Sequence, residues 1–174
     1  MADFVVFEDN FRAQGDIREQ LEIGGHTLVA PPQDTIQGAF RLLEMMATGN
    51  VAADFMLVDG TLEDEDPATA YSSPRSFHFE HEGETEKKTV PAGLLGRKTK
   101  EIIVPRVSVF TAELNVSRRH GRAIIDIARG LNIAPPAKII GFSGDGMSDL
   151  NVDFDIDYKN AKQIHEAVEA LRGE

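Results

Sequence analysis

Acidic, hydroxyl and ammonium side chains follow four apolar runs that lie far apart in the chain. Glu8 and Asp9 follow FVVF, Asp59 follows DFMLV, Ser143 follows AKIIGF, and Lys159 follows VDFDIDY. Each run has the composition of a short buried strand. Ligands of an open parallel sheet gather at the carboxyl ends of its strands, so these side chains are expected to meet at one edge. Carboxylates there suit Mg²⁺, and the ammonium and hydroxyl groups suit a phosphoryl group.

Helical segments are predicted between these strands. The expected helices begin near Asp16, at Asp34 or Thr35, near residue 118 and near Asn160, and residues 26–30 form a further strand. Apolar residues three and four positions apart mark each helix, as in Ile124, Ile125, Ala128 and Leu131. Short apolar strands that alternate with amphipathic helices predict an α/β fold, a doubly wound parallel sheet with helices on both faces.

The ordered set of polar residues resembles that of a response-regulator receiver domain, over roughly residues 3–62 and 117–172. The resemblance implies a five-stranded, flavodoxin-like sheet with Asp59 as the phosphoacceptor. It implies that Asp9, Asp59 and the backbone carbonyl of Thr61 bind Mg²⁺ and that Glu8 holds a metal-bound water. It also implies that the side chains of Ser143 and Lys159 contact the phosphoryl group.

Besides Glu8, which stands where the family more commonly has aspartate, three features depart from the family pattern. Asn160 follows the lysine, where the family usually has a proline that helps to aim it. Ile156 stands where the family has its aromatic switch residue, and Tyr158 is adjacent to the lysine instead. Only 16 positions separate Ser143 from Lys159 (159 − 143), fewer than in the family, so the fourth helix is expected to be shortened.

Residues 63–116 are expected to form a β-rich insertion within a single receiver-like domain, 1–174. Asp59 and Ser143 are 84 positions apart (143 − 59), many more than the family needs. The insertion starts with an acidic run at 63–66. Its pattern then predicts a hairpin in which residues 77–82 and 87–90 flank a turn at 83–86. Residues 101–110 predict another strand, and Pro105 favours an edge position. We expect the insertion either to cover a sheet edge or pair two subunits as a homodimer, or else to form a partner-binding surface or a lid gated by the state of Asp59.

Composition and net charge exclude or disfavour several kinds of site and partner. The chain has 174 residues, a net charge of −11 and no cysteine, so disulfides and thiolate metal sites are excluded. The acidic balance argues against a nucleic-acid partner. The chain has no apolar run long enough to span a membrane and no signal-peptide pattern at its start, so we expect a cytoplasmic protein.

The resemblance implies a stand-alone phosphoacceptor rather than an enzyme. A histidine kinase or a phosphotransfer protein would phosphorylate Asp59, and the signal would pass to a downstream protein target. The alternative is a degenerate receiver that acts as a protein-interaction module through its insertion. A phosphate-ester hydrolase is a weaker alternative, because Leu57 stands where the phosphatase motif that resembles VDGTLED has its nucleophilic aspartate.

Overall fold

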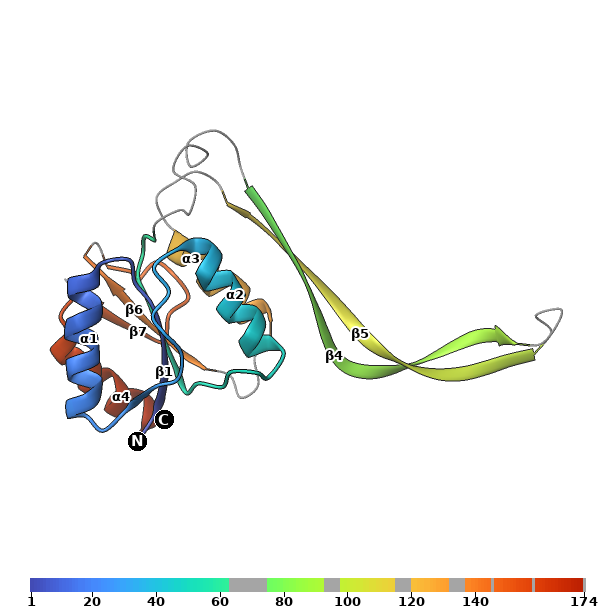
Figure 1. Cartoon of the computed structure of the whole chain (residues 1–174), viewed down its shortest axis with the longest axis horizontal. Helices are drawn as coiled ribbons and strands as arrows, with labels where there is room; N and C mark the ends of the chain where they lie inside the picture. The colour runs from blue at the N-terminus through green and yellow to red at the C-terminus, as the bar shows by residue number, and fades with distance from the viewer. Residues whose placement is uncertain are drawn as a thin grey trace.

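The computed structural model describes residues 1–62, 75–92, 98–114, 120–131, 137–144, 146–157 and 159–173. Its centre is a parallel sheet with the strand order β2-β1-β3-β6-β7, the flavodoxin-like order (Figure 1). The predicted doubly wound α/β fold is therefore confirmed. The strands are β1 (Asp3–Phe7), β2 (Thr27–Leu28), β3 (Phe55–Val58), β6 (Lys138–Ser143) and β7 (Phe154–Asp157).

Helices cover both faces of this sheet. Helices α1 (Phe11–Ile23) and α4 (Ile164–Arg172) lie on one face, and α2 (Ile36–Ala47) and α3 (His120–Gly130) lie on the other. Alternate residues of β1 point to opposite faces, so Phe4 and Val6 join one buried cluster and Val5 and Phe7 join the other. This two-sided burial explains why the central strands read as continuous apolar runs.

The first helix begins earlier than predicted. Asn10, rather than Asp16, is its N-cap, and the Asn10 side chain accepts hydrogen bonds from the backbone N–H groups of Arg12 and Ala13. Gly15 lies inside the helix, where the sequence suggested a loop. The expected cap of the second helix is confirmed, because Thr35 accepts a hydrogen bond from Gly38 N.

The described part of the link between β6 and β7, where a shortened helix was expected, consists of turns. In the described part of the link between β6 and β7, residues 144 and 146–153 form no helix, so the expected shortening is complete there. Asp153 anchors this link, because its Oδ2 accepts hydrogen bonds from Ile139 N at 2.6 Å and from Arg129 Nη2 at 2.7 Å. Arg129 belongs to α3, so the ion pair ties the link to the neighbouring helix.

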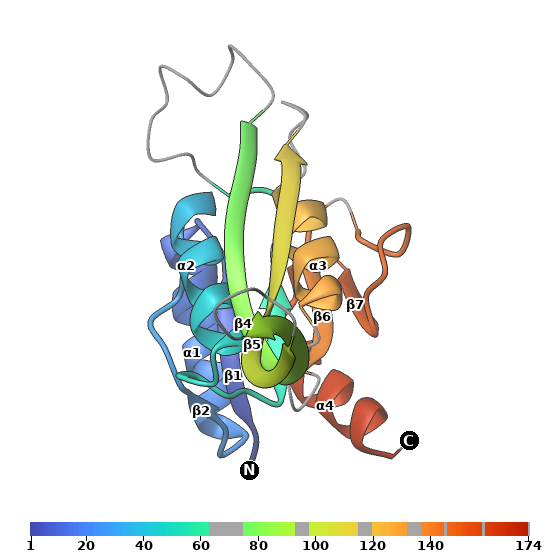
Figure 2. The same cartoon turned by 90° about the vertical axis from the view of Figure 1, so that its right-hand side faces the viewer.

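The insertion contains one long antiparallel hairpin, formed by β4 (Arg75–Ala92) and β5 (Lys98–Leu114) (Figures 1 and 2). The predicted turn at 83–86 is wrong, because β4 continues through it. A register shift between Glu82 and Thr85 lies there instead, with Pro105 opposite Thr85. A bulge accommodates turn-type residues within a strand, and proline is tolerated at bulges and on edges. The predicted edge position of Pro105 is confirmed, since the sheet has two strands.

Several predictions fall outside the described residues. They are the acidic run at 63–66, the start of the third helix before His120, and Tyr158. Among the helices that the structure does describe, none is both long enough and apolar enough to cross a membrane.

Candidate functional site

Parallel pairing brings the predicted acidic residues to one edge of the sheet. Phe7 and Val58, the last residues of β1 and β3, are register partners, and Asp59 N donates to Phe7 O at 2.8 Å. Glu8 and Asp59 therefore leave neighbouring strands at the same level. Glu8 and Asp59 are also almost fully buried, with 0% and 3% of their surfaces exposed.

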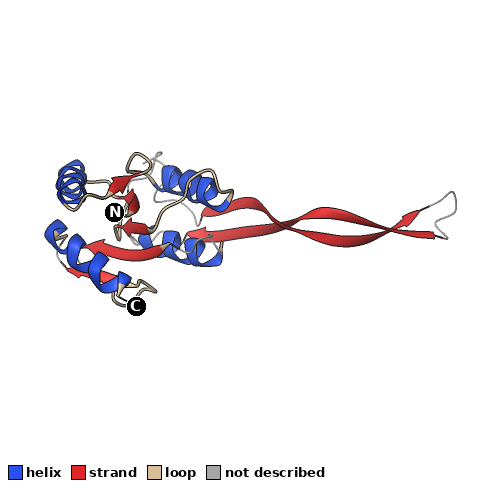
Figure 3. Cartoon of the chain, turned by 90° about the horizontal axis from the view of Figure 1, so that it is seen from below, coloured by secondary structure: helices blue, strands red, loops and turns tan. Residues whose placement is uncertain are grey.

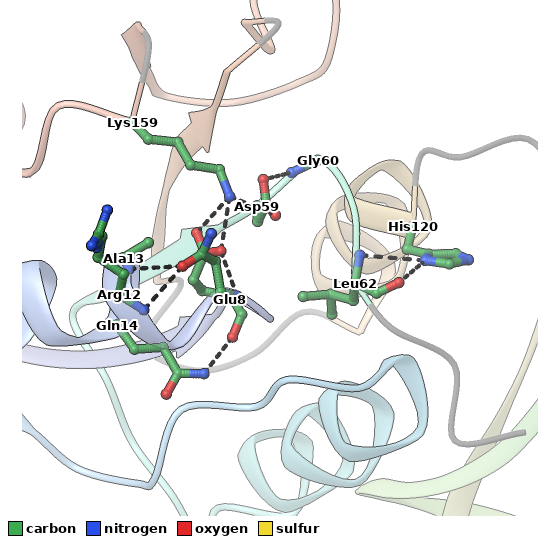
Figure 4. A network of polar contacts seen from close by, with 10 residues as sticks. Glu8, Arg12, Ala13, Gln14, Asp59, Gly60, Leu62, His120 and Lys159 are labelled. Atoms are coloured by element: carbon green, nitrogen blue, oxygen red, sulfur yellow. Dashed lines mark hydrogen bonds and ion pairs between the residues drawn. The ribbon is translucent and has the colours of Figure 1, made fainter. Parts of the chain in front are cut away.

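Lys159 joins these two carboxylates (Figure 4). Its Nζ lies 2.8 and 3.0 Å from the two carboxylate oxygens of Glu8 and 3.0 Å from Oδ2 of Asp59. The backbone at Lys159 is left-handed, with φ of 52°, a conformation that non-glycine residues rarely adopt. Asn160 then caps a short 3₁₀ helix, η1 (Ala161–Gln163). Lys159 thus reaches the acidic site with an asparagine, not a proline, at the next position.

Burial and the ammonium group act in opposite directions on the acids. Burial raises the pKa of Glu8 to about 7, although the hydrogen bond from Lys159 acts to lower it. Burial likewise raises the pKa of Asp59 against the same opposing hydrogen bond. Burial acts to lower the pKa of Lys159, but its contacts with the two carboxylates outweigh this and raise it. The site therefore favours a charged lysine and disfavours two fully ionised acids.

The backbone around Glu8 is fixed by three hydrogen bonds. Glu8 N donates to Gln33 O at 2.9 Å, and the Glu8 carbonyl accepts from Nε2 of the buried Gln14 at 2.6 Å. Asn10 N donates to Glu8 Oε1 at 3.0 Å. Gln14 was not among the predicted site residues, although its spacing of three and seven from Ile17 and Leu21 places it on the buried stripe of α1.

Glu8, Asp9 and Asp59 form a group that could hold a metal ion. Each offers one carboxylate oxygen, and these three oxygens lie within 4.8 Å of one another. Hard, anionic oxygen donors at this spacing fit Mg²⁺, which usually binds one or two carboxylates and several waters. Thr61 lies exposed two residues after Asp59, and the role of its carbonyl as a further ligand stays a prediction.

Ser143 lies beside the same loop. It is buried at the end of β6, and a Cβ added at Gly60 would approach the Ser143 hydroxyl oxygen to 2.8 Å. Glycine at position 60 therefore lets the hydroxyl approach the residue that follows Asp59. The structure thus brings Ser143 to the edge predicted for it.

The start of α3 contacts the Asp59 loop directly, which the sequence analysis did not foresee. Gly121 N donates to Gly60 O at 3.1 Å, and a Cβ added at Gly121 would lie 2.2 Å from the Asp59 carbonyl oxygen. His120 Nδ1 lies 2.7 Å from Leu62 O. A lone glycine at a helix start gives no signal of such a contact.

Comparison of the chain with protein-family models, with curated proteins and with solved structures found no match. The likeness to a receiver therefore rests on the five-stranded parallel sheet and on the acidic cluster of Glu8, Asp9 and Asp59.

Proposed function

We propose that this chain is a phosphoacceptor receiver of a two-component or phosphorelay system, with Asp59 as the acceptor. One observation carries the proposal: a buried aspartate at the carboxyl edge of β3 lies within 3.0 Å of a lysine ammonium and within 4.8 Å of two further carboxylates. This combination supplies a nucleophile, a metal site and a cation for the phosphoryl charge.

The proposed chemistry is transfer of a phosphoryl group to a carboxylate. An Asp59 oxygen forms a bond to phosphorus while the bond from phosphorus to the donor's leaving group breaks. Mg²⁺ held by Asp9 and Asp59, with Glu8 on a metal-bound water, would supply neutralisation of the phosphoryl oxygens. Lys159 exchanges part of its carboxylate contact for a phosphoryl oxygen, and Ser143 donates its hydroxyl hydrogen to another.

The proposed partners follow from this chemistry. A histidine kinase or a phosphotransfer protein donates the phosphoryl group, and a downstream protein reads the modified state. The chain is then a phosphoryl acceptor rather than an enzyme that turns over a substrate.

A degenerate receiver is the second candidate function. The favouring observation is that Lys159 already contacts both oxygens of Glu8 as well as Asp59, so an internal cation compensates the acids. Turns also replace the fourth helix in the described part of its link. In this reading the acidic site is structural, and the inserted hairpin binds other proteins.

Intact mass after incubation with acetyl phosphate, with and without Mg²⁺, tests the proposal. We expect a Mg²⁺-dependent gain of one phosphoryl group that hydroxylamine removes, because the product is an acyl phosphate. Asp59→Ala should abolish the gain, whereas the matched control Asp126→Ala, on the exposed side of α3, should retain it. Absence of the gain in the unmodified protein would support the degenerate receiver.

A further inference from the structure

The β4–β5 hairpin, here called the arm, projects far beyond the globular part of the protein (Figure 3). Among the described elements of that part, β4 contacts α2 and β5 contacts α3. Figure 1 shows that the distal half of the arm extends beyond both helices. With 18 residues in β4, the arm is roughly 60 Å long at about 3.3 Å per residue.

An isolated arm of this kind is expected to be only marginally stable. A two-stranded hairpin is marginally stable in water, and stability usually requires a third strand or packing against another element. The arm forms a sheet of its own with two strands, so each strand also has an outer edge without a ladder partner in the described structure. Unpaired edges are ready templates for another chain.

The sequence of the arm separates most of its charge along its length, with Arg106 beside the glutamates and Glu101 among the lysines as exceptions. Glutamates occupy alternate positions of the middle of β4, and lysines occupy the distal part of both strands. The register places them there, because Lys87 and Lys88 pair with Ile103 and Ile102, and Lys98 and Lys100 pair with Ala92 and Val90. The acidic segment is Glu80, Glu82, Glu84 and Glu86, and the basic tip is Lys87, Lys88, Lys98 and Lys100.

We propose that the arm is a dimerisation element in which the arms of two copies of this chain lie antiparallel to each other. With the two-fold axis near the junction of Glu86 and Lys87, the basic tip of each arm lies against the acidic segment of the other. A two-fold interface uses the same patch on both copies, so each complementary contact occurs twice. A second copy thus supplies both the missing packing partner and the opposite charge.

Apolar residues along the overlapping region add to the fit. Val90, Ile102 and Val104 all lie within the overlapping region, because the register pairs Val90 with Lys100, Ile102 with Lys88 and Val104 with Glu86. Burial of such residues between two arms supplies the hydrophobic contribution that a single arm lacks.

A second copy explains the charge pattern better than a nucleic acid does. The whole chain has a net charge of −11, and the acidic segment directly adjoins the basic tip. A polyanion that reached the tip would also meet four glutamates, whose repulsion acts within a Debye length of about 8 Å. Antiparallel pairing turns the same glutamates into favourable partners.

Sedimentation equilibrium of the full chain tests this arrangement. We expect the unmodified protein to form a dimer whose dissociation constant rises with salt, because exposed charges are screened. The tip variant K87E/K88E/K98E/K100E and the segment variant E80K/E82K/E84K/E86K should each dimerise at least about tenfold more weakly. An equimolar mixture of the two variants should recover the dimer, since each then meets the opposite charge.

The matched control for the tip variant carries the same change in net charge elsewhere. Arg12, Arg18, Arg122 and Lys162 are exposed residues of the globular part, and their replacement by Glu should leave the dimer intact. Circular dichroism of each variant checks that the fold persists. Recovery by mixing would not be seen if the variants had only unfolded.

Three outcomes would overturn the proposal. They are a monomer at roughly 100 µM chain, a dimer that is indifferent to both charge variants, and a monomer that binds a fluorescent DNA duplex through the tip lysines. The proposal is independent of phosphorylation, so Asp59→Ala should dimerise as the unmodified chain does. Failure of dimerisation and failure of phosphorylation are therefore separate results.

Discussion

The Nζ atom of Lys159 lies 2.8 Å from Oε1 of Glu8, a carboxylate with no exposed surface. The two residues are 151 positions apart, and the same ammonium is 3.0 Å from Asp59. Lys159 is therefore the internal counter-charge of a cluster that would otherwise hold only anions. The left-handed backbone at Lys159 is the conformation in which this contact is made.

Replacement of Lys159 by methionine should strongly destabilise the protein at neutral pH in the absence of Mg²⁺. The ammonium is lost while both buried carboxylates remain, and breaking a buried ion pair typically costs about 3–5 kcal/mol. Methionine keeps the length of the side chain and is as strained as lysine in a left-handed backbone, so the difference reports the charge. Urea unfolding measures the effect.

Added Mg²⁺ should restore part of the stability of Lys159→Met, because a ligand that binds only the folded state stabilises it. Lys162→Met, on the exposed side of η1, is the control and should stay within about 0.5 kcal/mol of the unmodified protein. Equal effects of the two substitutions would contradict the assigned role of Lys159.

The raised pKa of Glu8 predicts that the free energy of unfolding falls as the pH rises from about 5 to about 7.5. The folded protein raises the pKa of Glu8 from 4.5 to about 7, so between these values the folded state binds more protons than the unfolded state. Stability is then full below the unfolded pKa and is lost as the pH passes through the folded pKa. The loss is on the order of 2–3 kcal/mol.

Glu8→Gln should flatten this pH dependence, because glutamine keeps the size of the side chain and does not titrate. Some slope should remain, since the pKa of Asp59 is also raised. Glu22→Gln, an exposed position near the end of α1, should keep the original slope. Urea unfolding at several pH values gives the three slopes, and an unchanged slope in Glu8→Gln would disprove the prediction.

The predictable part of the structure is the part encoded by local pattern. Glu8, Asp59, Ser143 and Lys159 each end an apolar strand, and parallel strands bring such positions to one edge, so the edge could be predicted without coordinates. Turn-type residues misled the prediction at 83–86, because a glycine within a long strand produces a bulge as readily as a turn.

Contacts between backbone segments that are distant in the chain could not be predicted from the sequence. Gly121 packs on Asp59 across an insertion, and neither periodicity nor composition records which glycine meets which strand end. The same holds for Asp153, whose partners Ile139 and Arg129 lie on two other elements. Long-range polar contacts depend on how the elements pack together, which local sequence patterns do not predict.

Asp153→Ala should destabilise the protein by about 1–3 kcal/mol, because it leaves the backbone N–H of the fully buried Ile139 without its acceptor. The link that replaces the fourth helix also loses its tie to Arg129. Faster hydrogen exchange at the Ile139 amide would locate the effect.

Asp126→Ala provides the comparison for Asp153→Ala. Its ion pair with Arg122 is long, at 3.9 Å, and both side chains are about two-thirds exposed (65% and 69%). Exposed pairs of this kind contribute little, so the change should stay below about 0.5 kcal/mol. A comparable loss of stability in both variants would show that Asp153 has no special anchoring role.

Gly121→Ala should separate the start of α3 from the Asp59 loop. The added Cβ would lie 2.2 Å from the Asp59 carbonyl oxygen and 3.0 Å from Gly60 Cα, and backbone atoms cannot rotate away as a side chain can. Such overpacking typically costs about 1–3 kcal/mol. Because the displaced atoms belong to the proposed phosphoacceptor, phosphorylation by acetyl phosphate should slow as well.

Gly15→Ala is the matched control, since its added Cβ has no atom within 4 Å and Gly15 lies on the exposed side of α1. Alanine favours a helix over glycine by about 1 kcal/mol, so this variant should be as stable as the unmodified protein or more stable. Urea unfolding and the phosphorylation rate, measured on both variants, test whether the contact between Gly121 and the Asp59 loop affects stability and phosphorylation. If Gly121→Ala matched Gly15→Ala in both, the close packing of α3 on Asp59 would have no part in the stability or chemistry of the site.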